Sequence, residues 1–264
     1  MENQETQQPL IFESILVIED FLTKKEFRRL NYVAETEDWV TLSGNADAGL
    51  GVEWISDADP TDDDIASYNS YIKWKHLLNE CHQALDGSDF YILKEVQWKI
   101  QSAISAHLIK TTTSDQFYTL NCAMQKTNTD IPYYADTSFP VRSGQQYYMG
   151  SPNDRMLIKD NVAESLREFD YFFGDPTKNT ETYPTAWQVR PGFENYKFSA
   201  ILFLNDNFEG GDLVFPNQDV VISAKKNKLV IFPSSNEYVH GEVFTFNARV
   251  KVSYLGWFGC VGCE

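Results

Sequence analysis

One histidine, His240, lies within a series of short apolar segments near the C-terminus of the chain. Taken alone, an imidazole in such a place fits a metal ligand and a structural or surface role equally well. Further along, Lys251 and Ser253 are two residues apart, and residues with this spacing on a β-strand point to the same face. A cation beside a hydroxyl can bind a carboxylate through charge-assisted hydrogen bonds.

Alternation of apolar and polar residues predicts antiparallel strands through this part of the chain. Strands buried on one face typically show this pattern, which covers residues 198–204, 213–215, 229–232 and 250–257. Turn-forming residues at 205–211 and 233–236 separate the segments. Several short strands in series favour a sandwich or a closed sheet structure.

Four motifs follow one another in this region: FLNDNFEGGDLVFP, then KKNKLVIFPS, then His240-Gly241, then a basic residue six positions before Trp257. In this order they resemble the C-terminal half of the prolyl-4-hydroxylase-like iron(II)/2-oxoglutarate dioxygenases. The opening ILVIEDFLTKKEFRRLNYVAE also resembles the first strand and helix of that family. The resemblance implies a mainly β fold, a double-stranded β-helix of the jelly-roll, cupin-like type with bracing N-terminal helices. It further implies Fe(II) and 2-oxoglutarate as cofactors, with ascorbate as an additional candidate.

In this resemblance His240 is the distal histidine of a His-x-Asp...His triad, in which two imidazoles and one carboxylate hold Fe(II). The chain contains no His-x-Asp, and its remaining histidines are His76, His82 and His107. The segment Tyr134-Ala135-Asp136 resembles the strand and turn that carry the missing pair. Asp136 is therefore predicted as the carboxylate ligand, and Tyr134 stands where a histidine is expected. Alternatively, Asp136 could form an Asx turn.

Tyrosine at the histidine position changes the expected chemistry. A phenol with a pKa near ~10 coordinates well only after losing its proton, and the resulting phenolate favours Fe(III). Three interpretations of Tyr134 stay open: a Tyr/Asp/His iron centre, an Asp/His centre completed by water, and a metal-free protein. Two functions correspond to them. One is a prolyl 4-hydroxylase-like Fe(II)/2-oxoglutarate-dependent dioxygenase that hydroxylates a prolyl or other peptidyl side chain. The alternative is a catalytically silent jelly-roll binding protein derived from that family, so whether the protein is an enzyme is left open.

A basic residue on the last predicted strand is expected to hold the distal carboxylate of 2-oxoglutarate. Counting back from the tryptophan selects Lys251, whereas counting forward from the histidine selects Arg249. Lys251, with Ser253 beside it, is preferred because an insertion is easier in the preceding loop than within a strand. Tyr196, just before the strand at 198–204, is a further cofactor-binding candidate. Alternatively, Lys251 and Arg249 both lie on a solvent-exposed face of the strand.

The length of 264 residues is sufficient for one jelly roll with helical additions, so a single domain is predicted. Its expected parts are a disordered tail at 1–12, a strand and helices at 13–110, and a jelly-roll core at 114–258 with an insertion at about 138–190. Helical patterns cover roughly 64–86 and 89–110. The aromatic-rich insertion is interpreted as a substrate lid or partner-binding surface.

The chain is strongly acidic, with 22 basic and 38 acidic residues and a formal net charge of −16. Such a field repels phosphate backbones and attracts basic polypeptides, so we expect a basic polypeptide substrate and no duplex nucleic acid. The basic cluster at 225–228 is predicted to be an exposed turn. No apolar run approaches the roughly 18 residues of a membrane span, and the opening does not resemble a signal peptide. A cytoplasmic protein that does not bind membranes is expected, and its oligomeric state is left open.

Overall fold

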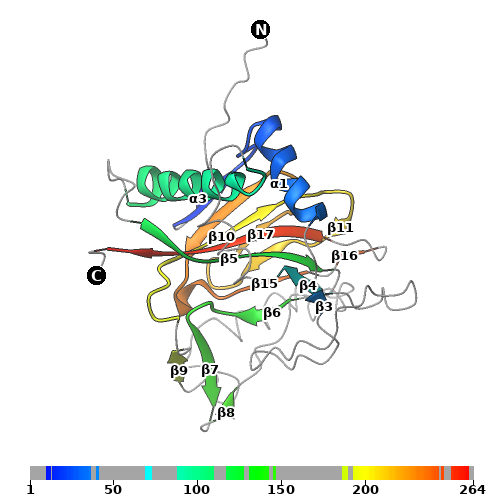
Figure 1. The fold of residues 1–264 in the computed structure, drawn as a ribbon. Helices are drawn as coiled ribbons and strands as arrows, with labels where there is room; N and C mark the ends of the chain where they lie inside the picture. The colour runs from blue at the N-terminus through cyan, green and yellow to red at the C-terminus, as the bar shows by residue number, and fades with distance from the viewer. Residues whose placement is uncertain are drawn as a thin grey trace.

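The computed structural model describes residues 10–12, 14–36, 40–41, 69–72, 88–109, 117–127, 131–142, 145–146, 186–189, 193–243, 245–246 and 251–261. Strands dominate these residues, and two helices lie over one side of them (Figure 1). All paired strands described are antiparallel.

The larger sheet has eight strands in the order β1-β2-β14-β10-β17-β5-β4-β3. These strands are β1 (Leu10–Phe12), β2 (Ile15–Ile18), β3 (Val40–Thr41), β4 (Asn69–Ile72), β5 (Phe117–Thr127), β10 (Phe198–Phe203), β14 (Leu229–Pro233) and β17 (Lys251–Cys260). The second sheet has the order β13-β12-β15-β6 and comprises β6 (Ile131–Tyr134), β12 (Leu213–Phe215), β13 (Val220–Ile222) and β15 (His240–Glu242). Two smaller groups are β8-β7-β9, with β7 (Ser138–Arg142), β8 (Gln145–Gln146) and β9 (Ala186–Val189), and β11-β16, with β11 (Glu209–Gly210) and β16 (Thr245–Phe246).

The two main sheets enclose an apolar core between them. Alternate residues of β10 and β14, such as Ile201, Phe203 and Phe232, meet residues of the second sheet, such as Phe215. The rings of Phe215 and Phe232 pack edge to face with centroids 4.9 Å apart. Burial of each such side chain stabilises the fold by about 1.5–3 kcal/mol. Two facing antiparallel sheets, with the predicted strands in place, confirm the double-stranded β-helix.

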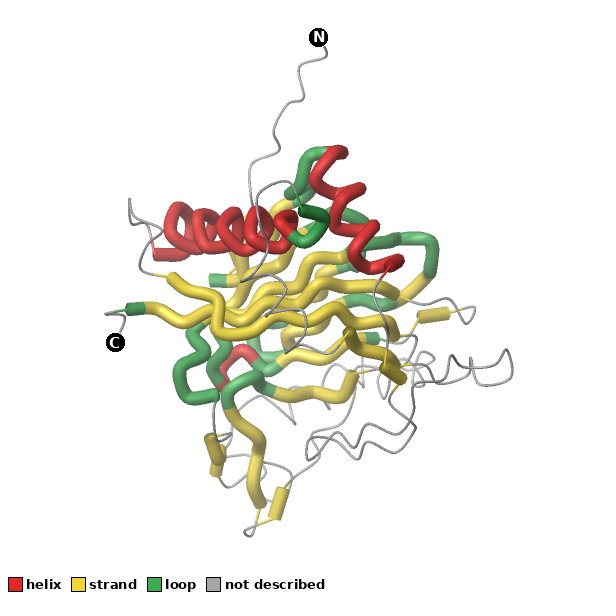
Figure 2. The backbone as a smooth tube through the Cα atoms, viewed as in Figure 1, coloured by secondary structure: helices red, strands yellow, loops and turns green. Residues whose placement is uncertain are grey.

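Helices cover the outer face of the larger sheet, as the predicted bracing role requires (Figures 1 and 2). Helix α1 (Lys24–Thr36) buries Leu30 and Val33, and helix α3 (Tyr91–Ala103) buries Val96 and Ile100, in one core cluster with side chains of the sheet. The three- and four-residue spacing of these positions forms the apolar stripe that a surface helix needs. A π-helical turn (Ile104–Ile109) continues α3, so the helix predicted at 89–110 is confirmed.

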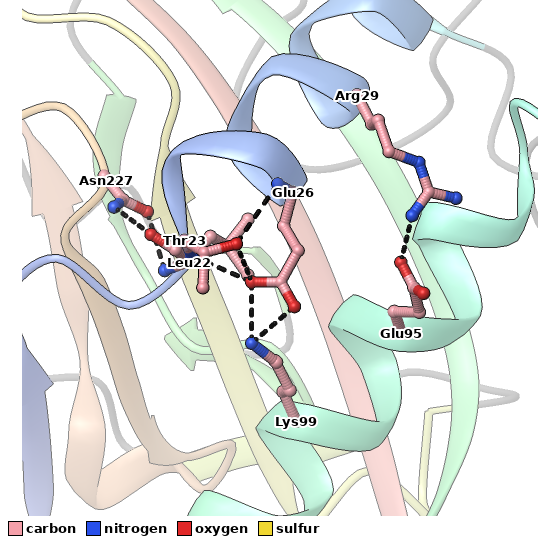
Figure 3. A network of polar contacts seen from close by, with 7 residues as sticks. All are labelled: Leu22, Thr23, Glu26, Arg29, Glu95, Lys99 and Asn227. Atoms are coloured by element: carbon pink, nitrogen blue, oxygen red, sulfur yellow. Dashed lines mark hydrogen bonds and ion pairs between the residues drawn. The ribbon is translucent and has the colours of Figure 1, made fainter.

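Helix α1 begins with a capping box and is joined to α3 by ion pairs (Figure 3). Thr23 N–H and Oγ1 both donate to Glu26 Oε2 at 2.8 Å, and Glu26 N–H donates to Thr23 Oγ1 at 3.3 Å. Lys99 Nζ lies 2.7 Å from the Glu26 carboxylate, and Arg29 Nη1 lies 2.6 Å from Glu95 Oε2. These contacts fix the crossing of the two helices.

Two predictions of secondary structure require correction. Leu10–Phe12, placed in a disordered tail, forms a strand whose apolar residues pair with β2. Asn69–Ile72, placed in a helix, forms a strand, because it finds pairing partners on β5 and carries the β-favouring Tyr71 and Ile72; the rest of that predicted helix lies outside the described residues.

The basic cluster at 225–228 does form a turn, but only part of it is exposed. Asn227 is buried with φ +63° and exchanges two hydrogen bonds with the backbone of Leu22 (Figure 3). Lys228 is also buried, where it pairs with Glu19 at 3.2 Å and donates to the Ser223 carbonyl at 2.7 Å. The turn therefore anchors the N-terminal segment to the jelly roll.

The predicted insertion begins and ends in paired strands. Strand β7 pairs with β9 from Ser138↔Val189 to Val141↔Ala186. The chain therefore leaves the jelly roll and returns to it at one place. Its predicted helix and most of its aromatic residues lie outside the described residues. No helix in the described ranges has the length and apolar character needed to cross a bilayer.

Candidate active site

His240 and Asp136 face each other at the interior of the jelly roll. His240 opens strand β15 and is 1% exposed, and Asp136 follows strand β6 by two residues and is also buried. Their Nε2 and Oδ2 atoms are 3.8 Å apart. This distance is too long for a hydrogen bond, but it is shorter than two metal–ligand bonds end to end, about 4.2 Å. One ion could therefore bind both atoms.

The tautomer of His240 is fixed by its second ring nitrogen. Nδ1 lies 3.0 Å from the carbonyl oxygen of Tyr238. Because a carbonyl can only accept, Nδ1 donates to it, and Nε2 is the ring nitrogen that faces Asp136. Ligating histidines in metal sites have this arrangement, in which the outer nitrogen donates to a backbone carbonyl. The rings of Phe215 and Phe232, with centroids 5.6 and 4.6 Å from the imidazole, exclude water around it.

Both oxygens of the Asp136 carboxylate accept hydrogen bonds from the larger sheet. Ser199 Oγ donates to Oδ2 at 2.7 Å, and Trp257 Nε1 donates to Oδ1 at 3.0 Å. Ser199 Oγ also lies 2.7 Å from Ser234 Oγ. Asp136 is thus held in one orientation by side chains that sequence reasoning did not identify as functional. The alternative role of Asp136 as only a turn former does not account for these interior contacts.

Tyr134 lies directly opposite His240 in the pairing of β6 with β15. The two ring centroids are 4.4 Å apart and the rings are inclined at 54°. The register shifts by one residue between His240 and Glu242, next to Pro132, which has no N–H to give to a sheet ladder. The structure therefore brings Tyr134, Asp136 and His240 together, as predicted.

The described part of the chain holds two conventional metal donors at this site, His240 and Asp136. Within the ranges that the structure describes, no group of three or more His, Cys, Asp and Glu side chains could hold a metal ion. Two donors, His240 Nε2 and the Asp136 carboxylate, fit an Fe(II) ion, and Tyr134, opposite His240, is the candidate third donor. Whether the tyrosine ligates stays a prediction.

Lys251 and Ser253, the predicted carboxylate site, are buried on the interior face of β17. Ser253 lies opposite Phe203, and the Lys251 ammonium is 5.8 Å from the Phe203 ring centroid. Lys251 Nζ also lies 3.4 Å from the Gly211 carbonyl oxygen. The alternative of a basic residue on a solvent face is wrong for Lys251, which is 1% exposed. Arg249 lies outside the described residues.

Glu242 is a site residue that the sequence analysis missed. Its carboxylate Oε2 is paired with Lys251 Nζ, and both side chains are buried. As they lie, these residues do not fit the distal carboxylate of 2-oxoglutarate, because the cation already has an anionic partner. The available signal was the spacing of Glu242 two residues after His240, which places both side chains on one face of a strand.

Tyr196 lies at the Asp136 end of the interior, away from the predicted carboxylate site. Its hydroxyl accepts a hydrogen bond from Asn121 Nδ2 at 3.2 Å, and its ring centroid lies 6.2 Å from that of Trp257. Burial raises the pKa of the Tyr196 phenol, the hydrogen bond from Asn121 lowers it, and the charge of Asp136 raises it. The net pKa is raised, so this phenol stays protonated at neutral pH.

Comparison with known proteins finds similarity to oxygenases and hydroxylases. Residues 178–259 match the family model of the 2OG-Fe(II) oxygenase superfamily. Prolyl 3-hydroxylase 2 of Rattus norvegicus and of Homo sapiens are each 32% identical over 79 residues, which are 28% of this chain and 11% of those proteins. The match thus spans about a tenth of the length of these relatives. A Pseudomonas putida prolyl-4-hydroxylase structure covers 94% of each chain at 15% identity with a TM-score of 0.49.

The segment that matches the model of this superfamily, residues 178–259, contains His240, Lys251 and Trp257. The predicted resemblance to oxygenases of the prolyl-4-hydroxylase-like type is thereby confirmed. Asp136 and Tyr134 lie outside that segment, so the structure alone places them beside His240.

Proposed function

We propose that the protein is an Fe(II)/2-oxoglutarate-dependent oxygenase that hydroxylates a prolyl or other peptidyl side chain. One observation carries this proposal. The buried imidazole of His240 donates from Nδ1 to the Tyr238 carbonyl and presents Nε2 to the Asp136 carboxylate. A histidine with a purely structural role has no need of a fixed carboxylate facing its free nitrogen at a distance that excludes a hydrogen bond.

Each residue of the site has a defined task in this proposal. His240 and Asp136 would hold iron, with Tyr134 or a water molecule as the next ligand. Iron, when bound, supplies the activation of dioxygen that hydroxylation of a C–H bond requires. Ser199 and Trp257 orient Asp136 through its two oxygens. The rings of Phe215 and Phe232 pack against the imidazole and hold it in place.

A peptidyl substrate is supported by two features of the chain. The matched relatives are prolyl hydroxylases by name, and the formal net charge of −16 favours a basic polypeptide over an acidic one. The β7–β9 stem begins two residues after Asp136, so the base of the stem, where Ser138 pairs with Val189, lies near the proposed metal ligands. This position suits a segment that contacts the substrate.

A second candidate function is a catalytically silent binding protein of the same fold. Two observations favour it: the tyrosine at the position of a histidine ligand, and the pairing of Lys251 with Glu242. A site that had lost turnover would no longer need an available third ligand or an available cation.

Metal titration separates the two functions. Anaerobic titration with Fe(II), or with Mn(II) followed by electron paramagnetic resonance, should show one site of micromolar affinity or better. His240→Ala should abolish it, whereas His107→Ala, in the π-helical turn after α3, should leave it intact. Absence of metal binding at micromolar concentration by the folded parent protein would support the silent binding protein.

A further inference from the structure

Glu242 and Lys251 form an ion pair in the interior of the jelly roll. Glu242 is 4% exposed and Lys251 is 1% exposed. A buried charge without a partner is strongly unfavourable, so each side chain provides the partner that the other requires. The resemblance to 2-oxoglutarate oxygenases predicts that the Lys251 ammonium pairs with an acidic co-substrate. In this structure Glu242, a residue of the same chain, neutralises that positive charge.

Two acidic side chains, Glu242 and Asp212, interact with Lys251. Its ammonium has three N–H donors, of which Glu242 and the Gly211 carbonyl take two. Asp212 is close enough to interact electrostatically with Lys251. A second carboxylate brought to Lys251 would therefore meet two acidic side chains and one cation.

Close packing holds the lysine side chain against a glycine turn. Gly211 has φ +72°, and a Cβ atom there would lie 3.3 Å from Lys251 Cδ and 2.9 Å from Phe208 Cε2. A side chain at this position would combine a backbone conformation that other residues rarely adopt with a clash against Phe208, so glycine fits best. The Gly210-Gly211 pair in the motif FEGGD therefore lets the lysine side chain pass toward Glu242.

Strand β15 connects this ion pair to the metal ligands. His240 and Glu242 are alternate residues of β15, about 7 Å apart along the strand, and both side chains are buried. His240 faces Asp136, and Glu242 faces Lys251. A dicarboxylate that reached from the metal end to Lys251 would therefore compete with the Glu242 carboxylate for the same ammonium group.

Ser253 points to a ligand at the same place. Its hydroxyl is fully buried, and Oγ has no hydrogen-bond partner among the residues that the structure describes. Ser253 is two residues from Lys251 on the same strand face. A buried hydroxyl without a partner is costly, and a carboxylate bound to Lys251 could accept a hydrogen bond from it.

We propose that Glu242 is an internal competitor for 2-oxoglutarate: its carboxylate occupies Lys251 in place of the distal carboxylate of the co-substrate and sets the affinity for it. This inference rests on the proposed function. Binding then exchanges one carboxylate for another at Lys251 and gives Ser253 an acceptor. Because Glu242 must leave the cation first, the parent protein binds 2-oxoglutarate weakly, and removal of the Glu242 charge strengthens binding.

Calorimetric titration with 2-oxoglutarate, and with glutarate, which lacks the 2-oxo group, tests the proposal. Glu242→Gln should bind each compound at least tenfold more tightly than the parent protein. Glu237→Gln, an exposed glutamate in the turn before β15, should bind as the parent does. Equal or weaker binding by folded Glu242→Gln would overturn the proposal and assign Glu242 a purely structural role.

A second variant and a second measurement cover the remaining outcomes. If Glu242→Gln does not fold, Glu242→Asp keeps the charge but withdraws the carboxylate by one methylene, and it should raise glutarate affinity by a smaller factor; unchanged affinity overturns the proposal. Glutarate binding is measured without metal, and Mn(II) binding is measured without dicarboxylate. Failure of Mn(II) to bind would contradict the proposed function, while the glutarate comparison still decides the role of Glu242.

Discussion

Ser199 and Trp257 lie directly opposite each other on β10 and β17, and each donates a hydrogen bond to a different oxygen of Asp136. The larger sheet therefore positions a carboxylate that belongs to a turn after a strand of the smaller sheet. This relationship couples the jelly-roll interior to the metal site, because a shift between the two sheets would turn the carboxylate away from His240.

Trp257→Phe should weaken metal binding while leaving the fold intact. The substitution keeps an aromatic ring but removes the Nε1–H donor to Asp136 Oδ1. Loss of such an outer hydrogen bond typically costs about 10–100-fold in metal affinity. Mn(II) titration measures the change, and Trp98→Phe, 62% exposed on α3, is the matched control. Equal affinity in parent and variant would show that the indole does not position the ligand.

Lys251→Met should destabilise the protein strongly, because Glu242 is then left buried without its cation. Breaking a buried ion pair in this way costs about 3–5 kcal/mol, whereas removing both charges often costs little. Lys251→Met combined with Glu242→Gln should therefore recover most of the lost stability in urea unfolding. Lys225→Met, at an exposed lysine, should change the unfolding free energy by no more than about 0.5 kcal/mol. A double variant no more stable than Lys251→Met would contradict a direct pairing.

Glu26→Gln should lower stability at neutral pH and flatten its dependence on acid pH. Burial raises the pKa of the Glu26 carboxyl, but hydrogen bonds from Lys99 and Thr23 and the charge of Lys99 lower it more, so the pKa lies below its ordinary value of 4.5. The stabilisation is therefore fully present above about pH 4.5 and is lost as the pH falls through the lower folded-state pKa. We expect a loss of about 1–2 kcal/mol at pH 7 from the cap and the ion pair.

Urea unfolding of the parent protein, Glu26→Gln and the exposed control Glu35→Gln at pH 3, 5 and 7 measures this effect. The difference between parent and Glu26→Gln should shrink toward pH 3. A difference that is constant with pH would mean that the glutamate acts through packing and not through its charge (Figure 3).

Local sequence patterns predicted the strands of the jelly roll and one bracing helix well, because alternation and helical spacing are set by which face is buried. The apolar runs that became β10, β12 and β14 were found in this way. Local pattern failed at Asn69–Ile72, where pairing with a long neighbouring strand decided the structure. Such pairing depends on residues far away in the sequence.

The candidate site was predicted only in part for the same reason. His240, Asp136 and Lys251 follow from motifs, whereas Ser199 and Trp257 act on Asp136 across 63 and 121 residues of sequence. Glu242 was missed because an acidic side chain in a short strand is usually exposed, and its burial depends on a partner that the strand itself does not reveal. Contacts of this kind require the three-dimensional structure.

Tyr134 decides between the active and the silent interpretation, because it lies opposite His240 where a histidine ligand is expected. If its phenolate binds iron, the aerobic protein should take up Fe(III) and show a visible tyrosinate charge-transfer absorption. Tyr134→Phe should abolish this absorption, since the ring remains and the ligand oxygen is removed. Tyr118→Phe, at an exposed tyrosine on β5, should keep it.

Tyr134→His provides the complementary test, because it rebuilds a His-x-Asp pair beside His240. One additional imidazole should raise Fe(II) affinity above that of the parent protein, measured by anaerobic titration. Combined with Glu242→Gln, which releases Lys251, it should also raise the decarboxylation of 2-oxoglutarate, measured as succinate formed. A correctly folded Tyr134→His protein with no gain in Fe(II) affinity would mean that the tyrosine does not mark the proximal ligand position, and that His240 and Asp136 bind metal without a third protein ligand on β6.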